Sequence, residues 1–478
     1  MQSPLIYWFR QDLRIKDNPT LTAAAQTGRP IMCVYILDQN QSNHWPNGAA
    51  TLWWLHHSLS RLSESLKALN IKLILRKGSV IEELDNIVQS TGAESLYFTR
   101  HYEPYNSDLE SQINQHFSDQ IEVKRFRGYL LYEPEAIRTG KDEPYKVFTP
   151  FYRCCLKTST PSAPVRAPKN LISYKKKIAS DRLNDWKLLP KTPNWAKGFN
   201  EHWVPGELGA HENLKDFITH SGNKYPVLRN RPDVTGKSRL SPHMHFGEIS
   251  PRQIWTAIKN SPKILEHNGE AYLRQLIWRD FAYHLLAHWP NFPEKPFRKE
   301  FNKFPWKTDT KSLQAWQQGN TGYPIVDAGM RELWKTGWMH NRVRMIVASF
   351  LIKDLLIPWQ QGEEWFWDTL VDANLANNAA SWQWVAGSGA DASPYFRVFN
   401  PVLQGEKFDP IGDYVREWVP ELKYIPKKYI HSPWLAPEDI LIKAKITLGK
   451  NYPHPIIDHS FARDRALAAY KKLKDSNG

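Results

Sequence analysis

Residues Leu5–Phe9 read LIYWF and residues Ile31–Leu37 read IMCVYIL, two short apolar runs that decide the fold of the first part of the chain. Similar runs follow at residues 72–76 (KLILR), 95–98 (SLYF) and 121–126 (IEVKRF), and each is typical of a short buried strand. Helix-like segments separate them, such as residues 51–69 (TLWWLHHSLSRLSESLKAL), where apolar residues return every three or four positions. This alternation predicts a doubly wound parallel sheet, with its ligand site at the carboxyl ends of the strands near a switch in strand order.

The pattern changes twice along the rest of the chain. Residues 131–200 are rich in Pro, Lys, Thr and Ser and keep no steady period, which indicates a connector on the surface. Beyond residue 200, residues 270–289, 323–337 and 341–359 each read as an amphipathic helix, with Gly337 as a stop and Pro324 and Pro358 as boundaries. We therefore predict an α/β domain over residues 1–130, a linker over 131–200 and an all-α domain over 201–478.

Composition narrows the class of protein. A 478-residue chain with 41% apolar and 23% charged residues predicts a globular protein of two or three domains. Its apolar runs are too short for a membrane span or a signal peptide, so we expect a soluble, cytoplasmic protein. Cys33, Cys154 and Cys155 supply neither a disulfide framework nor a paired zinc motif, and no HExxH, P-loop or GxGxxG occurs, so we expect no metal site.

The chain carries a formal net charge of +14. Such a charge favours a polyanionic partner, most simply nucleic acid, because binding then releases counterions. A basic but inert surface has the same charge, so the charge alone does not separate the two interpretations.

Three helical segments concentrate side chains that core helices rarely carry. In the first, Gln275, Trp278 and Arg279 are spaced i, i+3 and i+4 and share one stripe. The other two segments, residues 340–345 and 372–384, add further amides, arginines and tryptophans. Buried amides and arginines need partners, so together the three segments predict a polar pocket floored by aromatic rings that holds a planar ligand. A fourth piece, SRLS at residues 238–241, suits a phosphate just before a helix but is also common as a helix cap.

These segments resemble the photolyase/cryptochrome flavoprotein family, most closely microbial cyclobutane pyrimidine dimer photolyases of the class I and class III type. The motifs that carry the resemblance follow one order along nearly the whole chain: WFRQDLRIKDNPTL, SRLSPHMHFGEIS, TGYPIVDAGMRELW, GWMHNRVRM, WFWDTLVDANLANNAASWQW, PYFRVFNP and QGEKFDPIGDYVREWVPEL. The resemblance implies an N-terminal antenna domain, a linker and a C-terminal helical domain that binds FAD. It also implies UV-damaged DNA as partner, a monomeric state and an antenna pigment, methenyltetrahydrofolate or alternatively a deazaflavin.

The resemblance further implies roles for individual residues. The FAD-binding positions it matches are Tyr225, Lys237, Ser238, Arg239, Leu240, Ser241, Gln275, Arg279, Asn341, Arg344, Asp372, Ala373, Asn374 and Asn378. Among them, Asn378 is expected near flavin N5, and Arg344 and Asp372 are expected to pair over the flavin ring. The positions of an electron relay are Trp306, Trp359 and Trp382. The positions that contact DNA or the lesion are Arg229, Gln275, Trp278, Asn341, Arg342, Met345, Trp384, Arg397 and Gln404.

The implied activity is light-dependent DNA repair, in which a carbon–carbon lyase splits cyclobutane dimers by electron transfer from photoexcited reduced FAD. The chain departs from the pattern of many dimer photolyases with Gln275 in place of a glutamate, Asn374 in place of an aspartate and Lys237 in place of a threonine. Gln275 is shared with (6-4) photolyases, but Met345 stands where these carry a second histidine.

Two other functions stay open at this point. A cryptochrome photoreceptor is the main alternative, since TGYPIVDAGMRELW and HSPW are plant-cryptochrome-like, whereas Asn378 and the short C-terminal tail favour repair. A flavin-free DNA-binding protein would explain the charge but not the relay tryptophans.

Overall fold

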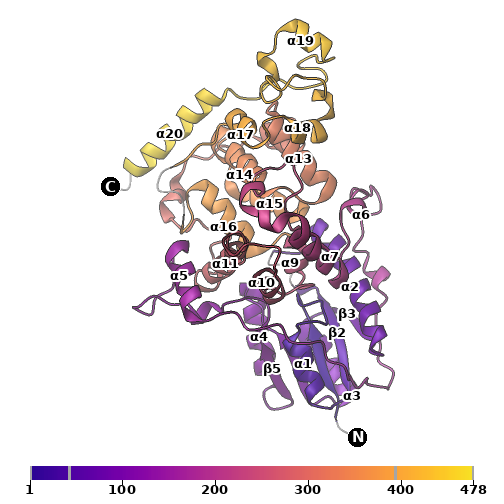
Figure 1. The fold of residues 1–478 in the computed structure, drawn as a ribbon. Coiled ribbons are helices and arrows are strands. Elements are labelled where there is room, and N and C mark those ends of the chain that lie inside the picture. The colour runs from indigo at the N-terminus through magenta and orange to yellow at the C-terminus, as the bar shows by residue number, and fades with distance from the viewer. Residues whose placement is uncertain (1–2, 41–44, 392–395, 476–478) are drawn as a thin grey trace. The chain divides into compact units, whose positions relative to one another are not determined.

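The computed structural model describes residues 3–40, 45–391 and 396–475 and divides into two compact units (Figure 1). Unit 1 comprises Met1–Asn223, Ser238–Pro290 and Val371–Asn374, and unit 2 comprises Lys224–Lys237, Asn291–Leu370 and Leu375–Gly478. No helix in the described part of the chain is long and apolar enough to cross a membrane. The domain boundaries at residues 130 and 200 stay predictions.

Unit 1 contains a five-stranded parallel sheet. Its strands are β1 (Leu5–Phe9), β2 (Ile31–Asp38), β3 (Leu73–Gly78), β4 (Ser95–Thr99) and β5 (Glu122–Phe126), in the spatial order β3-β2-β1-β4-β5. In the central strand, Tyr7 pairs with Cys33 on one side and with Tyr97 on the other. The order reverses at β1, where the chain crosses from β3 to β4, so the sheet is doubly wound as predicted.

Helices cover both faces of the sheet because right-handed crossovers in opposite directions place them on opposite sides. α1 (Pro19–Gln26) and α2 (Ala49–Ala68) follow β1 and β2, and α3 (Val80–Thr91) and α4 (Pro104–Phe117) follow β3 and β4. The core beneath α3 and α4 contains Trp8 and Phe98 from the sheet, Leu84 from α3 and Phe117 from α4, all buried.

The remaining described chain is helical, which confirms the predicted fold class of an α/β sheet domain followed by an all-α domain. In unit 1 these helices are α5 (Phe148–Thr158), α6 (Phe199–His202), α7 (Glu207–Asp216), α9 (Ser241–His245), α10 (Pro251–Lys259) and α11 (Glu266–His288). In unit 2 they are α8 (Tyr225–Leu228), α12 (Thr310–Gln317), α13 (Pro324–Thr336), α14 (Asn341–Ser349), α15 (Trp359–Thr369), α16 (Leu375–Ala386), α17 (Pro401–Phe408), α18 (Asp413–Trp418), α19 (Glu438–Lys443) and α20 (His459–Asp475).

Three elements differ from the sequence-based expectation. β5 forms but is largely exposed and not buried, because it is an edge strand and carries Lys124 and Arg125. Helix α5 lies within the expected connector and buries Phe148, Phe151 and Cys155, which are spaced i, i+3 and i+7. The helix expected over residues 341–359 ends earlier, since α14 passes into a single π-helical turn, η7 (Phe350–Asp354), and α15 starts anew after Pro358.

A buried arginine joins the segment after β1 to two distant segments of unit 1. Arg14, 1% exposed, donates hydrogen bonds to the backbone carbonyls of Asp17, Gly128 and Gly247 at 2.7 to 3.2 Å. The Asp17 carboxylate in turn accepts hydrogen bonds from the Ser250 hydroxyl and from Arg252 Nη2, the latter at 2.7 Å. The ends of the sheet strands and the α9–α10 segment are therefore held together by charge-assisted hydrogen bonds.

Gly247 supplies a test of this junction. It has φ +65°, and a Cβ there would lie 2.0 Å from the Gln11 carbonyl oxygen, whereas Gly92, with φ +67°, would meet nothing within 4 Å. We expect Gly247→Ala to lower the free energy of unfolding by about 3 kcal/mol or more, because the backbone of the junction must move. Gly92→Ala should cost only the left-handed conformation, about 1–2 kcal/mol. Denaturant unfolding of both variants measures this, and equal losses would contradict the close approach.

Candidate functional site

Arg279 of α11 lies in a buried polar corner of unit 1. Its guanidinium carbon is 4.3 Å from the centre of the Tyr129 ring and 5.2 Å from that of Tyr283. Nη1 donates to the Tyr129 carbonyl at 2.9 Å, while the buried Nη2 has no hydrogen-bond partner within the described residues. A buried cationic donor without an acceptor raises the free energy of the folded protein. This corner therefore fits a ligand that brings an anionic or carbonyl oxygen to Nη2.

A chain of hydrogen bonds fixes Asn374 beside the same two tyrosines. Asn374 Nδ2 donates to the Tyr283 hydroxyl, which donates to the Tyr129 hydroxyl at 3.1 Å. Tyr129 donates onward to Gln11 Oε1 at 3.1 Å. Burial is the main cause that raises the pKa of both tyrosines, so they stay neutral donors. The orientation of the Asn374 amide is thus set by the side chains that enclose Arg279.

The SRLS segment begins helix α9. The Ser238 hydroxyl accepts a hydrogen bond from Tyr272 at 2.8 Å, and Arg239, with φ +51°, places its guanidinium 4.9 Å from the Trp203 ring centre. Leu240 is buried at the N-cap and Ser241 is the first helical residue. In the same helical part of unit 1, Gln275 Nε2 donates to the Ala271 carbonyl one turn earlier in α11.

In unit 2, Asn378 of α16 is held against α15. Its Nδ2 donates to the Glu363 backbone carbonyl at 3.0 Å. The Glu363 side chain is fully buried, and neither carboxyl oxygen has a hydrogen-bond partner among the residues described. Burial, and then the nearby Glu364 and Glu294, raise the pKa of Glu363 well above its ordinary value, so the group is a neutral acid. Gly362 allows the close approach of the helices, since a Cβ there would lie 2.1 Å from the Trp382 ring.

The three predicted relay tryptophans differ in exposure. Trp382 and Trp359 are 2% and 1% exposed, and Trp306 is partly exposed and lies 4.4 Å from Phe304 between ring centres. The ring neighbours of Trp382 include Phe366 at 5.0 Å and Trp316 at 6.3 Å. Two of the three indoles are therefore buried, and Trp306, the last position of the predicted relay, is the one that reaches solvent.

Three predicted DNA-contacting arginines gather in unit 2. Arg342 donates to Asn230 Oδ1 at 2.9 Å and lies 4.5 Å from the Phe408 ring centre. Its pKa is lowered by burial first and then by the positive charges of Arg229 and Arg397, so both of these cations are near Arg342. Such a cluster of like charges favours a polyanion.

Lys353 supports the backbone of Arg397. Its ammonium donates to the Arg397 carbonyl and lies 4.3 Å from the Phe396 ring centre. Burial lowers the pKa of Lys353 to about 7. The side chain of Arg397 remains exposed.

The other predicted site residues of unit 2 differ in their contacts and exposure. Arg344 Nε donates to the Met339 carbonyl at 2.8 Å, and Arg229 lies 5.5 Å from the Tyr225 ring centre. Lys237 donates to the carbonyls of residues 231, 232 and 234, so its ammonium closes this turn of backbone. The remaining positions are Asn341, which opens α14 and is exposed, and the partly exposed Met345, Trp384 and Gln404.

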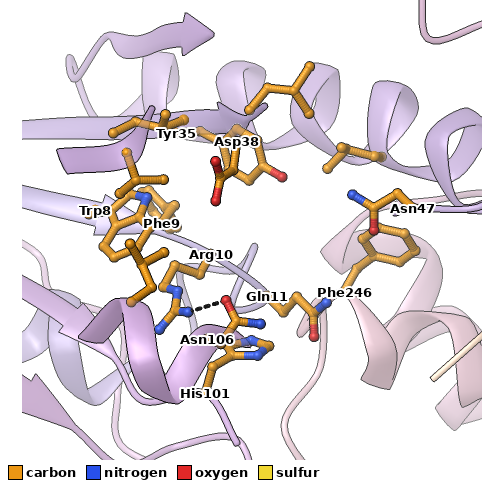
Figure 2. A pocket seen from close by; sticks show the side chains of 15 residues that line it. Trp8, Phe9, Arg10, Gln11, Tyr35, Asp38, Asn47, His101, Asn106 and Phe246 are labelled. Carbon is orange, nitrogen blue, oxygen red and sulfur yellow. Dashed lines mark hydrogen bonds between the residues drawn. The ribbon is translucent and has the colours of Figure 1, made fainter. Parts of the chain in front are cut away.

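A pocket lies at the carboxyl ends of β1, β2 and β4, where the strand order switches, as predicted for this sheet (Figure 2). It encloses about 660 Å³ of empty space, its open mouth included. In Figure 2, Asn106 and His101 lie across from Tyr35 and Asp38, and Arg10 donates to Asn106 Oδ1 at 2.6 Å. Its lining residues are Trp8, Phe9, Arg10, Gln11, Tyr35, Ile36, Leu37, Asp38, Asn47, Leu55, Val80, His101, Asn106, Leu109 and Phe246.

His101 lines this pocket, and its surroundings keep the imidazole neutral. It is 3% exposed, and neither ring nitrogen has a hydrogen-bond partner within the described part of the chain. Burial, together with the charges of Arg10, His245 and Arg279, lowers its pKa well below the ordinary value. A neutral imidazole with uncommitted nitrogens suits a ligand with polar edges.

Several residues that no sequence pattern indicated lie at or beside the predicted site residues. Among them are Phe148, Tyr152 and Arg274, which stack together beside Trp278, and the buried acid Glu363. The i, i+4 spacing of Phe148 and Tyr152 was a usable signal for one helix face, but nothing in it pointed to the partner helix.

Comparison with known proteins identifies the family. Residues 5–169 match the model of the DNA photolyase domain, and residues 272–472 match that of the FAD-binding domain of DNA photolyase. The chain belongs to the DNA photolyase family.

Individual relatives extend over the full length. The chain is 50% identical to a deoxyribodipyrimidine photo-lyase of Agrobacterium fabrum (strain C58), covering 99% of this chain and 98% of that protein. It is 36% identical to cryptochrome-1 of Arabidopsis thaliana, covering 98% of this chain and 70% of that protein. A crystal structure of a bacterial class III photolyase from Agrobacterium tumefaciens superposes with a TM-score of 0.96 at 49% identity, covering 99% of this chain and 98% of that one.

The buried Glu363 acid generates a pH-dependent prediction. Its pKa is higher in the folded state than in the unfolded state, so the folded protein binds more protons between these two values, and stability falls as pH rises through that window. Gln does not titrate. We therefore expect Glu363→Gln to be close to the parent in stability near pH 5 and more stable than it at pH 8.

Denaturant midpoints at pH 5, 7 and 8 measure this difference. Glu406→Gln is the matched control, because Glu406 is exposed and is not one of the charges that raise the pKa of Glu363, so its replacement should leave the pH profile of stability unchanged. A Glu363→Gln variant that is equally destabilised at every pH would show that the carboxyl is needed for a contact and is not a buried neutral acid.

Proposed function

We propose that this chain is a deoxyribodipyrimidine photo-lyase that repairs cyclobutane pyrimidine dimers in UV-damaged DNA under light. The observation that carries the proposal is full-length similarity to a protein of that name. The shorter coverage of the plant cryptochrome makes a photoreceptor the second candidate. A cytoplasmic location and a monomeric state are parts of the same proposal.

FAD fits the polar groups that each unit contains. When bound and reduced, FAD supplies the electron that opens the cyclobutane ring after light absorption. In unit 1, Arg279 Nη2 and the Ser238–Ser241 segment would hold anionic or carbonyl oxygens of the cofactor, and Asn374, Asp372 and Ala373 would border it. In unit 2, Asn378 would face the flavin, with its orientation set by the Glu363 carbonyl.

DNA recognition would divide between charge and stacking. Arg229, Arg342 and Arg397 would bind the backbone of the damaged strand, because phosphate contacts position a protein without reading sequence. Trp278, Trp384 and Met345 would pack against a dimer that has left the base stack, and a damaged pair costs least to flip out. Asn341, Gln275 and Gln404 would hydrogen-bond the polar edges and backbone.

The pocket at the strand ends would hold the antenna pigment. Its walls combine rings of Trp8, Tyr35 and Phe246 with the polar groups of Arg10 and His101, which suits a planar heteroaromatic molecule. We assign it to methenyltetrahydrofolate, with a deazaflavin as the alternative, and the absorption of pigment extracted from the protein distinguishes them.

Trp382, Trp359 and Trp306 would pass electrons from the surface to the cofactor. We expect Trp306→Phe to abolish stable photoreduction, because the partly exposed member of the relay is lost, while repair by chemically reduced protein continues. Absorption during illumination with a reductant measures the first property. Trp334→Phe is the control, since Trp334 is 50% exposed and stacks on Trp365 outside the relay. Normal photoreduction in Trp306→Phe together with its loss in Trp316→Phe would route the electrons through Trp316, a buried ring neighbour of Trp382 at 6.3 Å, instead of through Trp306.

Repair of defined lesions tests the proposed function itself. We expect the reduced wild-type protein to repair cyclobutane dimers, and Gln275→Glu to keep or raise the quantum yield, because a carboxyl is the group typical of dimer repair at this position. The assay compares both proteins on cyclobutane and (6-4) lesions. Repair of (6-4) lesions alone would overturn the lesion assignment, and photoreduction without repair of either lesion would favour the photoreceptor.

A further inference from the structure

Trp278 is held by a ring from a different helix of unit 1. Phe148, the first residue of α5, stacks on Trp278 of α11 with ring centres 3.5 Å apart and planes 7° from parallel. Phe281 meets both rings edge-on, at 5.8 Å from Phe148 and 5.9 Å from Trp278. One face of the Trp278 indole is therefore covered by Phe148, and a ligand can stack only on the other face or meet the edge.

An arginine extends the stack by one more layer. The Arg274 guanidinium carbon lies 5.2 Å from the Phe148 ring centre and 5.1 Å from that of Tyr152. Arg274 and Trp278 are one turn apart on α11, as are Phe148 and Tyr152 on α5, and the two helices pack against each other (Figure 1). The two i, i+4 pairs thus interleave, and they present an oriented guanidinium beside the indole.

The charge of Arg274 is available for a ligand. Its side chain is exposed, and within the described residues no carboxylate forms a salt bridge with it. The acid one turn earlier on α11, Glu270, lies 3.7 Å from Lys259 instead. Aromatic rings attract and orient a guanidinium but do not neutralise it, so its in-plane donors keep their preference for a phosphate or carboxylate.

We propose that Arg274, oriented by Phe148 and Tyr152, binds a backbone phosphate of the DNA strand whose damaged bases pack against Trp278. This inference rests on the proposed function and adds a contact outside the arginine cluster of unit 2. Phe148 is the positioning residue of the pair, because it sets both the plane of the indole and the place of the guanidinium.

Salt-dependent DNA binding tests the contact. The probes are a duplex oligonucleotide with one cyclobutane thymine dimer and the same duplex undamaged. We expect Arg274→Gln to weaken binding of both about tenfold at low salt, by analogy with other charge-assisted contacts. It should also reduce the slope of log affinity against log salt by about one unit, since one phosphate contact is lost. The matched control is Arg182→Gln, which removes the same charge from an exposed arginine already paired with Asp185 at 2.9 Å, and should change neither quantity.

A second variant separates orientation from charge. Phe148→Leu keeps Arg274 but removes its platform, so it should lower the salt slope and also reduce discrimination between the two duplexes, with a changed near-UV circular dichroism signal from Trp278. Arg274→Gln should leave that signal and the thermal midpoint unchanged, because its side chain is exposed.

The outcomes distinguish this inference from the proposed function. If the wild-type protein binds neither duplex, both the proposed function and the Arg274–phosphate contact are wrong. If the wild type binds and Trp278→Ala loses discrimination, but Arg274→Gln keeps the full affinity and salt slope, then only the phosphate contact is overturned and the stack serves packing alone.

Discussion

The buried guanidinium of Arg14 is the constraint on which the structure of unit 1 depends. A fully buried cation is tolerated only where its donors are used and its charge is compensated, and Arg14 meets both conditions through three backbone carbonyls and the neighbouring Asp17. Because those carbonyls belong to separate segments, the strand-end pocket and the SRLS segment cannot shift independently. A second buried link, from Trp54 of α2 through Glu248 to His243 of α9, reinforces the same junction.

Local patterns were enough to predict the elements with a strong period. The buried strands formed where short apolar runs occur, and α2, α11 and α13 formed where apolar residues return every three or four positions. Gly337 ended α13 in the left-handed conformation. The failures have physical causes as well. β5 was predicted as a buried strand but lies at the edge of the sheet, and its position, not its composition, determines its exposure. The apolar stripe of α5 is short and lies in a segment rich in Pro and Lys, so it did not indicate a helix.

The site was predictable only in part, because its chemistry depends on contacts between distant segments. The resemblance indicated which positions matter, yet the gathering of Arg229, Arg342 and Arg397 joins three separate stretches of chain. The stack of Phe148 on Trp278 joins residues from two helices that no pattern relates. The neutral acid at Glu363 is likewise a property of its surroundings, since glutamate in a sequence reads as an exposed charge.

The π-helical turn η7 has a consequence for how insertions and deletions would act on this protein. The turn holds one residue more than an α-helical turn, and each residue rotates a helix by about 100°. Lys353, within the turn, points inward to the Arg397 carbonyl. Deleting a single residue between Phe350 and Asp354 would restore an ordinary helix and swing Lys353 away, so that the chain bearing Arg397 loses its anchor. The one surplus residue of the turn therefore fixes the position of the Lys353 ammonium against the Arg397 backbone.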